Sequence, residues 1–213
     1  MCRFKAIPVI EEQHTVDPLS CEGCGYCPRV YPEETIVMEN QNVGKWFISD
    51  VKTGTQMVHA RLGIGAENSG KPVAQVKNEA KRLASEAGKK FVLVDGLPGV
   101  GCPVVSSLWG ASFVLLVTEP TFSALHDLKR VYELVKKFSI RTGCIINKSD
   151  LSSEVSREIE QFLGKEGIVH IASLPYNETF TEAMTEGQTI VEYDRNHLAE
   201  VLKKSWEKVK EIV

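Results

Sequence analysis

Three cysteines stand two residues apart near the start of the chain and could together bind a metal. Cys21, Cys24 and Cys27 are separated by residue pairs that each contain a glycine, and Tyr31 and Pro32 follow them. Thiolates at this spacing converge from one short loop on the irons of a 4Fe-4S cluster. In the usual cluster-binding run a further cysteine precedes the proline, and here that position is Tyr31. The spacing therefore predicts three cluster ligands in this segment.

Cys2 is the candidate for the fourth ligand. In proteins with two such runs, the last cysteine of one run ligates the cluster of the other. Cys2 begins the sequence Cys-Arg-Phe-Lys-Ala-Ile and resembles the last cysteine of a preceding run, so we expect one 4Fe-4S cluster with the ligands Cys2, Cys21, Cys24 and Cys27. Structural zinc is the alternative, but its sites usually join two separated ligand pairs. Disulfides are not expected, because the N-terminus has no apolar signal-peptide core.

Size and composition limit the class of protein. The chain has 213 residues, of which 43% are hydrophobic, enough for one α/β domain with a small appendage. A net charge of -3 and the absence of a long apolar run predict a cytoplasmic protein with no nucleic-acid or membrane partner. Cys102 and Cys144 stand among apolar residues, and we expect both to be buried in the core.

The expected elements divide the chain into two parts. Residues 1–43 are polar, and we expect a partial ferredoxin-like iron-sulfur module whose order depends on its metal. Residues 44–213 predict an α/β domain, which begins with a hairpin over 44–62 and a helix over 72–87. Four short apolar runs then predict a mainly parallel sheet with helices on both faces, with strands at 91–94, 112–117, 143–146 and 168–172.

A polar loop follows the first of these expected strands, at the edge where open α/β sheets bind ligands. The apolar run ends in Asp95, and a Gly-Leu-Pro-Gly turn continues to Gly99. In phosphate-transferring NTPases an aspartate at this place holds the Mg²⁺ shell, and a glycine turn lets a backbone N–H approach the γ-phosphate. The alternative is that Asp95 caps the helix that follows.

The sequence Asn-Lys-Ser-Asp follows the third expected strand. The amide of Asn147 can donate to and accept from a purine edge, and the stem of Lys148 can lie across the ring. The sequence alone leaves adenine and guanine open, because Asp150 could bind guanine. Alternatively, Ser149, Asp150 and Ser152 form the N-terminal cap of the next helix. The turn at Pro175, after the fourth strand, could contact a base through its backbone.

A glycine-rich match at residues 65–71 is not expected to be a phosphate-binding loop. Gly65, Gly70 and Lys71 fit the pattern G-x4-G-K, in which backbone N–H groups and the lysine hold phosphates. The pattern requires Ser or Thr next, whereas Pro72 has neither a hydroxyl nor an N–H. We expect Pro72 to begin a helix and the glycines, with Lys71, to form a flexible loop that could act as a conformational switch.

In this order, the cysteine run, the turn from Asp95 to Gly99 and the loop at Asn147 resemble a known family. They are similar to MinD/ParA/Mrp-type P-loop ATPases that carry an inserted ferredoxin domain and are related to cobyrinic acid a,c-diamide synthase domains. Residues 58–65, 67–71, 99–103 and 117–121 extend the resemblance. It implies that Asp95 is associated with Mg²⁺, that Gly99 senses the γ-phosphate and that Asn147 contacts adenine. Mg-ATP or Mg-ADP is then the implied ligand.

The chain also departs from this family. The family's first strand and glycine-rich phosphate loop precede the ferredoxin insert, and they are not among these residues. Residues 44–213 are therefore expected to be a truncated P-loop NTPase-like domain with weak or absent ATPase activity by itself. A homodimer, or a complex with a protein that supplies the missing N-terminal half, would fill the gap. The family usually has a cysteine at the position of Tyr31, and its replacement agrees with the loss of a second cluster.

Three functions follow from this resemblance. The first is a protein that couples its nucleotide state to electron transfer or cluster handling, with a redox partner or a cluster recipient. The second is a non-enzymatic iron-sulfur electron-transfer or scaffold module whose nucleotide site has decayed. The third is a cobyrinate-type ATP-dependent amide synthase, which is disfavoured because the chain has no glutaminase segment.

Overall fold

The structure is a computed structural model. It describes residues 2, 4–18, 20–21, 23–30, 35–39, 42, 44–64, 66, 70–194 and 197–213. The chain forms two compact units, Met1–Leu97 with Cys102–Ser107, and Pro98–Gly101 with Leu108–Val213. The predicted division at residue 43 stays a prediction. Tyr31 and Gly65, both singled out by the sequence, lie outside the described residues.

The cysteine-bearing segment contains only short elements. β1 (Val9–Ile10) and β2 (Gln13–His14) pair antiparallel, and α1 (Cys27–Val30) is a single turn that begins at the last cysteine of the run. Almost every described side chain in these elements is exposed or half-buried. The segment therefore has little hydrophobic core, and its dependence on a metal stays a prediction.

The predicted hairpin is confirmed by two strands that pair along their whole length. β3 (Gly44–Asp50) and β4 (Gln56–Leu62) are antiparallel, with Gly44 opposite Leu62. The predicted helix is also confirmed, because α2 (Lys71–Glu86) follows the hairpin and Pro72 lies in its first turn. A proline is tolerated there because the first N–H groups of a helix have no partner within it.

The N-terminus of α2 packs closely on α3 (Cys102–Leu108). Gly70 has a φ of 86°, and a Cβ at this position would lie 2.9 Å from the carbonyl oxygen of Cys102. Lys77, which is 6% exposed, donates from Nζ to the carbonyl oxygens of Ser106 (2.8 Å) and Ser107 (2.9 Å). Burial, with a smaller contribution from Lys81, lowers the pKa of Lys77. Lys77 thus satisfies carbonyl groups at the end of α3.

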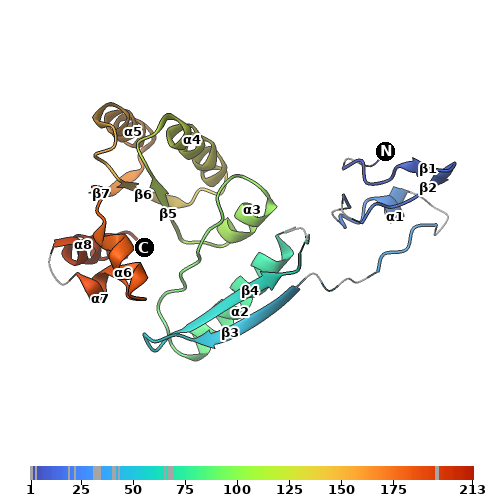
Figure 1. Cartoon of the computed structure of the whole chain (residues 1–213), viewed down its shortest axis with the longest axis horizontal. Helices are drawn as coiled ribbons and strands as arrows, with labels where there is room; N and C mark the ends of the chain where they lie inside the picture. The colour runs from blue at the N-terminus through green and yellow to red at the C-terminus, as the bar shows by residue number, and fades with distance from the viewer. Residues whose placement is uncertain are drawn as a thin grey trace. The chain divides into compact units, whose positions relative to one another are not determined.

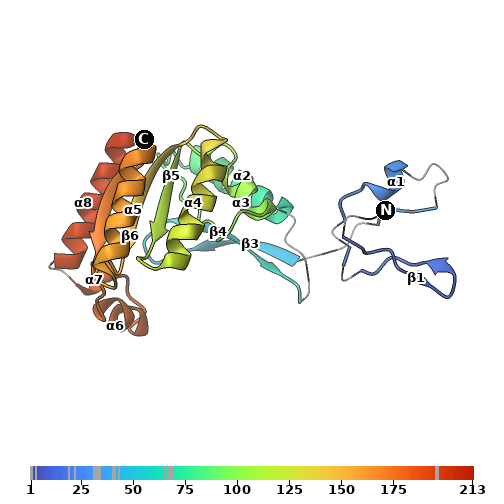
Figure 2. The same cartoon turned by 90° about the horizontal axis from the view of Figure 1, so that it is seen from above.

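The second unit is a three-stranded parallel sheet covered on both faces. Its strands lie in the order β5 (Phe113–Thr118), β6 (Arg141–Asn147), β7 (Val169–Leu174). On one face α4 (Phe122–Lys136) and α5 (Ser153–Glu166) lie side by side (Figures 1 and 2). The short helices α6 (Thr179–Thr185) and α7 (Ile190–Tyr193) precede the last helix, α8 (His197–Ile212).

The two hydrophobic clusters of this unit show which helix covers which face. Leu128 of α4 and Ile159 of α5 pack with Leu116 and Ile146 of the sheet. On the opposite face, Val209 of α8 packs with Ile145 and Ile171. The α/β fold with a parallel sheet and helices on both faces, predicted from the strand and helix patterns, is thereby confirmed.

The strand predicted at residues 91–94 is wrong for this structure. Residues 91–97 belong to no strand, and Leu93 and Val94 are 81% and 44% exposed. An apolar run becomes a buried strand only where neighbouring strands accept its backbone hydrogen bonds and helices cover its side chains. In the described part of the chain, residues 91–97 join no sheet, and most of their side chains are exposed.

The two other cysteines differ from each other. Cys144 is fully buried in the centre of β6, as predicted, and burial raises the pKa of its thiol to about 12. It therefore remains a protonated thiol at neutral pH. The prediction that Cys102 is buried is wrong, because Cys102 is the first residue of α3 and is exposed.

Thr118, the last residue of β5, provides a test of the core. Its side chain is 8% exposed, and its hydroxyl has no hydrogen-bond partner among the described residues. Because valine has the same shape without the hydroxyl, Thr118→Val is expected to raise the free energy of unfolding by about 1 kcal/mol. Urea denaturation measures the change.

Thr142→Val is the matched control for this substitution. Thr142 is also 8% exposed, but its hydroxyl donates to the carbonyl oxygen of Ile140 at 3.0 Å. We expect the free energy of unfolding of this variant to fall by about 1 kcal/mol. If Thr118→Val loses as much stability as Thr142→Val, the hydroxyl of Thr118 is hydrogen-bonded in the folded protein.

Candidate functional site

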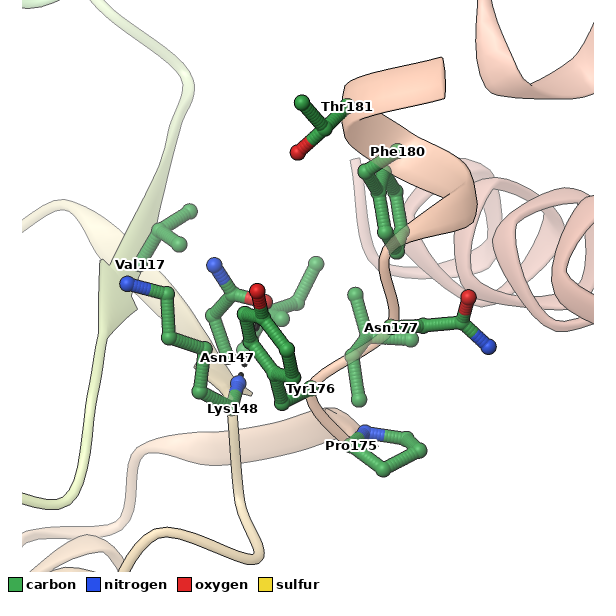
Figure 3. Close-up of a pocket in the computed structure, with 10 residues that line it drawn as sticks. Val117, Asn147, Lys148, Pro175, Tyr176, Asn177, Phe180 and Thr181 are labelled. Atoms are coloured by element: carbon green, nitrogen blue, oxygen red, sulfur yellow. Dashed lines mark hydrogen bonds between the residues drawn. The ribbon is translucent and has the colours of Figure 1, made fainter. Parts of the chain in front are cut away.

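A pocket of about 350 Å³ lies at the carboxyl ends of the parallel strands. This edge is where open α/β sheets bind ligands, and the volume is at the lower end of the range for small-molecule sites. Figure 3 shows the pocket between the strand ends and α6. Its lining combines an apolar floor with several polar groups: Val117, Ile145, Asn147, Lys148, Leu174, Pro175, Tyr176, Asn177, Phe180 and Thr181.

The loop after β6 holds Asn147 at this pocket. The side-chain oxygen of Asn147 accepts the backbone N–H of Lys148 at 3.0 Å, and Lys148 adopts a left-handed φ of 49°. The next N–H, that of Ser149, donates to the carbonyl oxygen of Leu174 at the end of β7 (2.9 Å). These bonds tie the loop to the neighbouring strand. The amide nitrogen of Asn147 has no partner among the described residues, so it can donate to a ligand.

Lys148 forms an ion pair with Glu119. Its Nζ lies 3.1 Å from Oε2 of Glu119, which directly follows β5, and both side chains are about 40% exposed. A half-exposed pair of this kind contributes at most about 1 kcal/mol to stability. In Figure 3 the stem of Lys148 extends toward Val117. Glu119 was not predicted as a site residue from the sequence.

The predicted helix cap after this loop is confirmed in part. The hydroxyl of Ser152 accepts the N–H of Val155 at 3.3 Å and caps α5. Asp150 instead accepts the backbone N–H of Tyr176 at 2.7 Å. One oxygen of Asp150 is thus already bonded within the protein, and this bond fixes the turn that carries Pro175 and Tyr176.

The turn after β7 continues into α6, which forms the far wall of the pocket. The side-chain oxygen of Asn177 accepts the N–H of Thr179 at 2.9 Å, and in Figure 3 this side chain points away from Asn147. Phe180 and Thr181 of α6 face the pocket in the same view. Neither was predicted from the sequence, where only their position a few residues after a strand end could have indicated them.

The structure thus brings Asn147, Lys148 and Pro175 together in one pocket, whereas the other predicted nucleotide residues lie elsewhere in the chain. Asp95 is exposed and belongs to the first unit; Gly99 belongs to the second and has a φ of 91°. A common site for these two residues and the pocket stays a prediction.

The predicted switch loop is described only at its end. Gly70 is the residue before α2, with a left-handed backbone, and Lys71 is the exposed first residue of the helix. Because Gly70 packs against α3, its backbone is constrained by neighbouring atoms at this point. The role of the loop as a switch stays a prediction.

The four predicted cluster ligands offer the required chemistry without a preformed cage. Cys21 and Cys24 are exposed, Cys2 and Cys27 are half-buried, and all four thiols are free. Among the described residues, no three His, Cys, Asp or Glu side chains are grouped so that they could hold a metal ion. The donor set fits an iron-sulfur cluster, but the described loop would have to close around it.

Comparison with known proteins identifies the fold. No protein-family model matches the chain. Among solved structures, the chain is similar to the cell division ATPase MinD of Pyrococcus furiosus, with a TM-score of 0.55, 21% identity, and coverage of 70% of this chain and 61% of that one. It also resembles MinD of Pyrococcus horikoshii complexed with Mg-ADP (TM-score 0.55, 24% identity, 68% and 58% coverage). MinD of Aquifex aeolicus gives a TM-score of 0.58 at 16% identity, with 77% and 68% coverage.

These structures define the class: the chain has an α/β fold similar to that of the MinD P-loop ATPases. Two curated relatives come from Methanocaldococcus jannaschii. The uncharacterized protein MJ0578 is 28% identical over 156 residues, which is 72% of this chain and 52% of the relative. The uncharacterized protein MJ0579 is 26% identical over 184 residues, or 85% and 61%. The chain therefore spans only about half to three fifths of the length of these relatives.

No helix in the described part of the chain is long and apolar enough to cross a membrane.

Proposed function

We propose that this protein binds an adenine nucleotide in the pocket at Asn147 and an iron-sulfur cluster at its cysteines. Its nucleotide state is then coupled to electron transfer or to cluster handling. The observation that carries the nucleotide proposal is the position of Asn147, Lys148 and Pro175 around one pocket at the carboxyl edge of a MinD-like sheet. A protein of similar fold has been solved with Mg-ADP. Cytoplasmic localisation is part of the same proposal.

The hydrogen bonds around the pocket favour adenine over guanine. The amide of Asn147 can donate to N7 of a purine and accept from the exocyclic amino group of adenine, whereas guanine presents a carbonyl oxygen there. Recognition of guanine would use the carboxylate of Asp150, and one oxygen of this group already accepts the N–H of Tyr176. Lys148, held by Glu119, provides an aliphatic stem beside the base.

The phosphates of the nucleotide require binding groups from outside the pocket. The only G-x4-G-K sequence of the chain continues with Pro72, which cannot donate an N–H or ligate Mg²⁺. Without a phosphate loop the β- and γ-phosphates lack their main electrostatic stabilisation, so the chain by itself should hydrolyse ATP weakly or not at all. The proposed partner is a segment that carries such a loop, and a homodimer is the alternative.

The iron-sulfur half of the proposal rests on the cysteines. Cys21, Cys24 and Cys27 would hold three irons of a 4Fe-4S cluster, and Cys2 the fourth. When bound, such a cluster supplies one-electron transfer. Because the segment has little core of its own, cluster binding would also order it. A redox partner or a cluster recipient is implied.

Isothermal calorimetry with Mg-ADP tests the nucleotide site. Asn147→Ala is expected to weaken binding about tenfold to one-hundredfold, because two hydrogen bonds to the base are lost. Asn78→Ala is the matched control, since Asn78 is exposed on α2, and it should bind like the wild type. Equal affinities of the two variants would contradict the proposed site.

A second function is favoured by one observation, the missing Ser or Thr after Lys71. In this alternative the nucleotide site has decayed and the protein is a cluster-bearing electron-transfer or scaffold module. The same titration separates the two functions, because a scaffold would show no heat of binding with Mg-ADP. Tight binding that depends on Asn147 would rule the scaffold out.

A further inference from the structure

Glu119 carries a half-exposed carboxylate on a fixed stretch of backbone. It directly follows β5, and its neighbours Thr118 and Pro120 are both buried. The N–H of Thr121 donates to the carbonyl oxygen of Glu119 at 2.8 Å, and the hydroxyl of Thr121 accepts the N–H of Ala124 and caps α4. The backbone that carries this carboxylate is therefore held by the core and by α4.

Lys148 also has a backbone that is held in place, but its side chain is long. Its φ is 49°, and its carbonyl oxygen accepts the N–H of Leu151 at 3.0 Å. A lysine side chain has many rotamers and loses much conformational entropy when it is held in one of them. Nζ of Lys148 lies 3.1 Å from Oε2 of Glu119. Glu119 thus restrains the end of a side chain that would otherwise move among many conformations.

The ion pair also affects how the charge of the pocket can be used. Among the described residues that line the pocket, Lys148 is the only one with a charged side chain. A lysine beside a nucleotide can act through its apolar stem, which lies against a base, or through its ammonium, which binds phosphate. Here the ammonium is already neutralised by Glu119, and this carboxylate repels phosphate. The geometry therefore favours use of the stem.

We propose that Glu119 is a positioning residue of the nucleotide pocket, which holds the ammonium of Lys148, keeps the lysine stem beside the base and withholds its charge from the phosphates. The inference rests on the proposed function, because it concerns the same site. It also names the ligand class that the chain recognises by itself. That class is the adenine nucleoside, with little dependence on the number of phosphates attached to it.

NMR titration of the full chain with adenosine, AMP and ADP tests the inference, because it measures weak as well as tight binding. For the wild type, the three dissociation constants should agree within about fivefold, since the lysine at the pocket is paired. Glu119→Gln keeps the shape of the side chain without its charge. It should weaken adenosine binding about two- to fivefold, whereas ADP binding should change less than about twofold because the released ammonium attracts phosphate.

Glu158→Gln is the matched control for this substitution. Glu158 is an exposed carboxylate on α5, so the variant has the same change in net charge as Glu119→Gln. All three dissociation constants should equal those of the wild type. Equal losses for adenosine and ADP in Glu119→Gln would indicate a merely structural role and would overturn the inference.

A double variant separates the two possible uses of Lys148. When Glu119→Gln is combined with Lys148→Met, a flexible apolar stem remains and both charges are absent. The ratio of the ADP and adenosine dissociation constants should then return to its wild-type value. A weaker preference for ADP than in the wild type would assign the ammonium to the phosphates and overturn the inference.

The same titrations distinguish this inference from the proposed function. If none of the three ligands binds the wild type, or if Asn147→Ala binds them equally well, the nucleotide site is wrong and the inference falls with it. If binding depends on Asn147 but is unchanged in Glu119→Gln, the nucleotide site stands and only the role of Glu119 is overturned.

Discussion

Cys24→Ser is expected to abolish cluster binding. Protein reconstituted anaerobically with iron and sulfide should hold about four irons per chain, and the variant about none. Cys24 is the middle ligand of the run and lies between Gly23 and Gly25, whose φ values are 57° and 69°. Serine retains the shape of the side chain but is a poor ligand for iron, so the loss measures ligation rather than folding.

Two further substitutions make this test specific. Cys102→Ser removes another exposed thiol and should leave the iron content unchanged. Cys2→Ser tests the crossover ligand and should lower iron to about three atoms or none. Iron and sulfide analysis with an absorption spectrum measures all variants. An unchanged cluster in Cys2→Ser would contradict the fourth ligand, and an unchanged cluster in Cys24→Ser would contradict the whole site.

Ile159→Ala is expected to have the largest effect on stability. Ile159 is fully buried on α5 and packs in the cluster that joins α4, α5 and the sheet. The truncation removes buried methyl and methylene groups and leaves a cavity, so the free energy of unfolding should fall by about 2–5 kcal/mol. Since domains are stable by only about 5–15 kcal/mol, such a loss would unfold much of the second unit at moderate temperature.

Ile64→Ala is the matched control, because Ile64 is fully exposed. The free energy of unfolding of this variant should differ from that of the wild type by no more than about 0.5 kcal/mol. Urea denaturation followed by circular dichroism compares the two variants. A loss below about 1 kcal/mol for Ile159→Ala would mean that the α5 face collapses around the deleted atoms or is not the core of this unit.

The same core positions the candidate pocket. Ser152 caps α5 beside the loop that carries Asn147 and Lys148, and the hydroxyl of Ser156 on α5 donates to the carbonyl oxygen of Ser149 at 2.7 Å. A helix held by Ile159 therefore also holds the loop that carries Asn147 and Lys148. We expect Ile159→Ala to weaken Mg-ADP binding indirectly, in parallel with its loss of stability.

Local patterns in the sequence were sufficient for most of the elements. The Thr-Gly-Thr turn between two strand-like runs predicted the hairpin, and apolar runs predicted β5, β6 and β7. The positions of Asn147, Lys148 and Pro175 at the ends of two apolar runs predicted three residues of the pocket, because the ends of parallel strands meet at one edge. Such features depend on residues a few positions apart, so no tertiary contact was needed to predict them.

Other features depended on distant residues and were decided only by the tertiary structure. Residues 91–94 have the composition of a strand, but a strand requires a pairing partner, and these residues join no sheet in the described part of the chain. Glu119 reaches Lys148 from another strand end, and Asp150 binds the backbone of Tyr176 rather than capping α5. Phe180 lines the pocket because α6 lies beside the ends of the strands. The sequence by itself thus determined the elements and the cysteine and strand-end motifs, whereas tertiary contacts determined which of these elements gained partners and which side chains met.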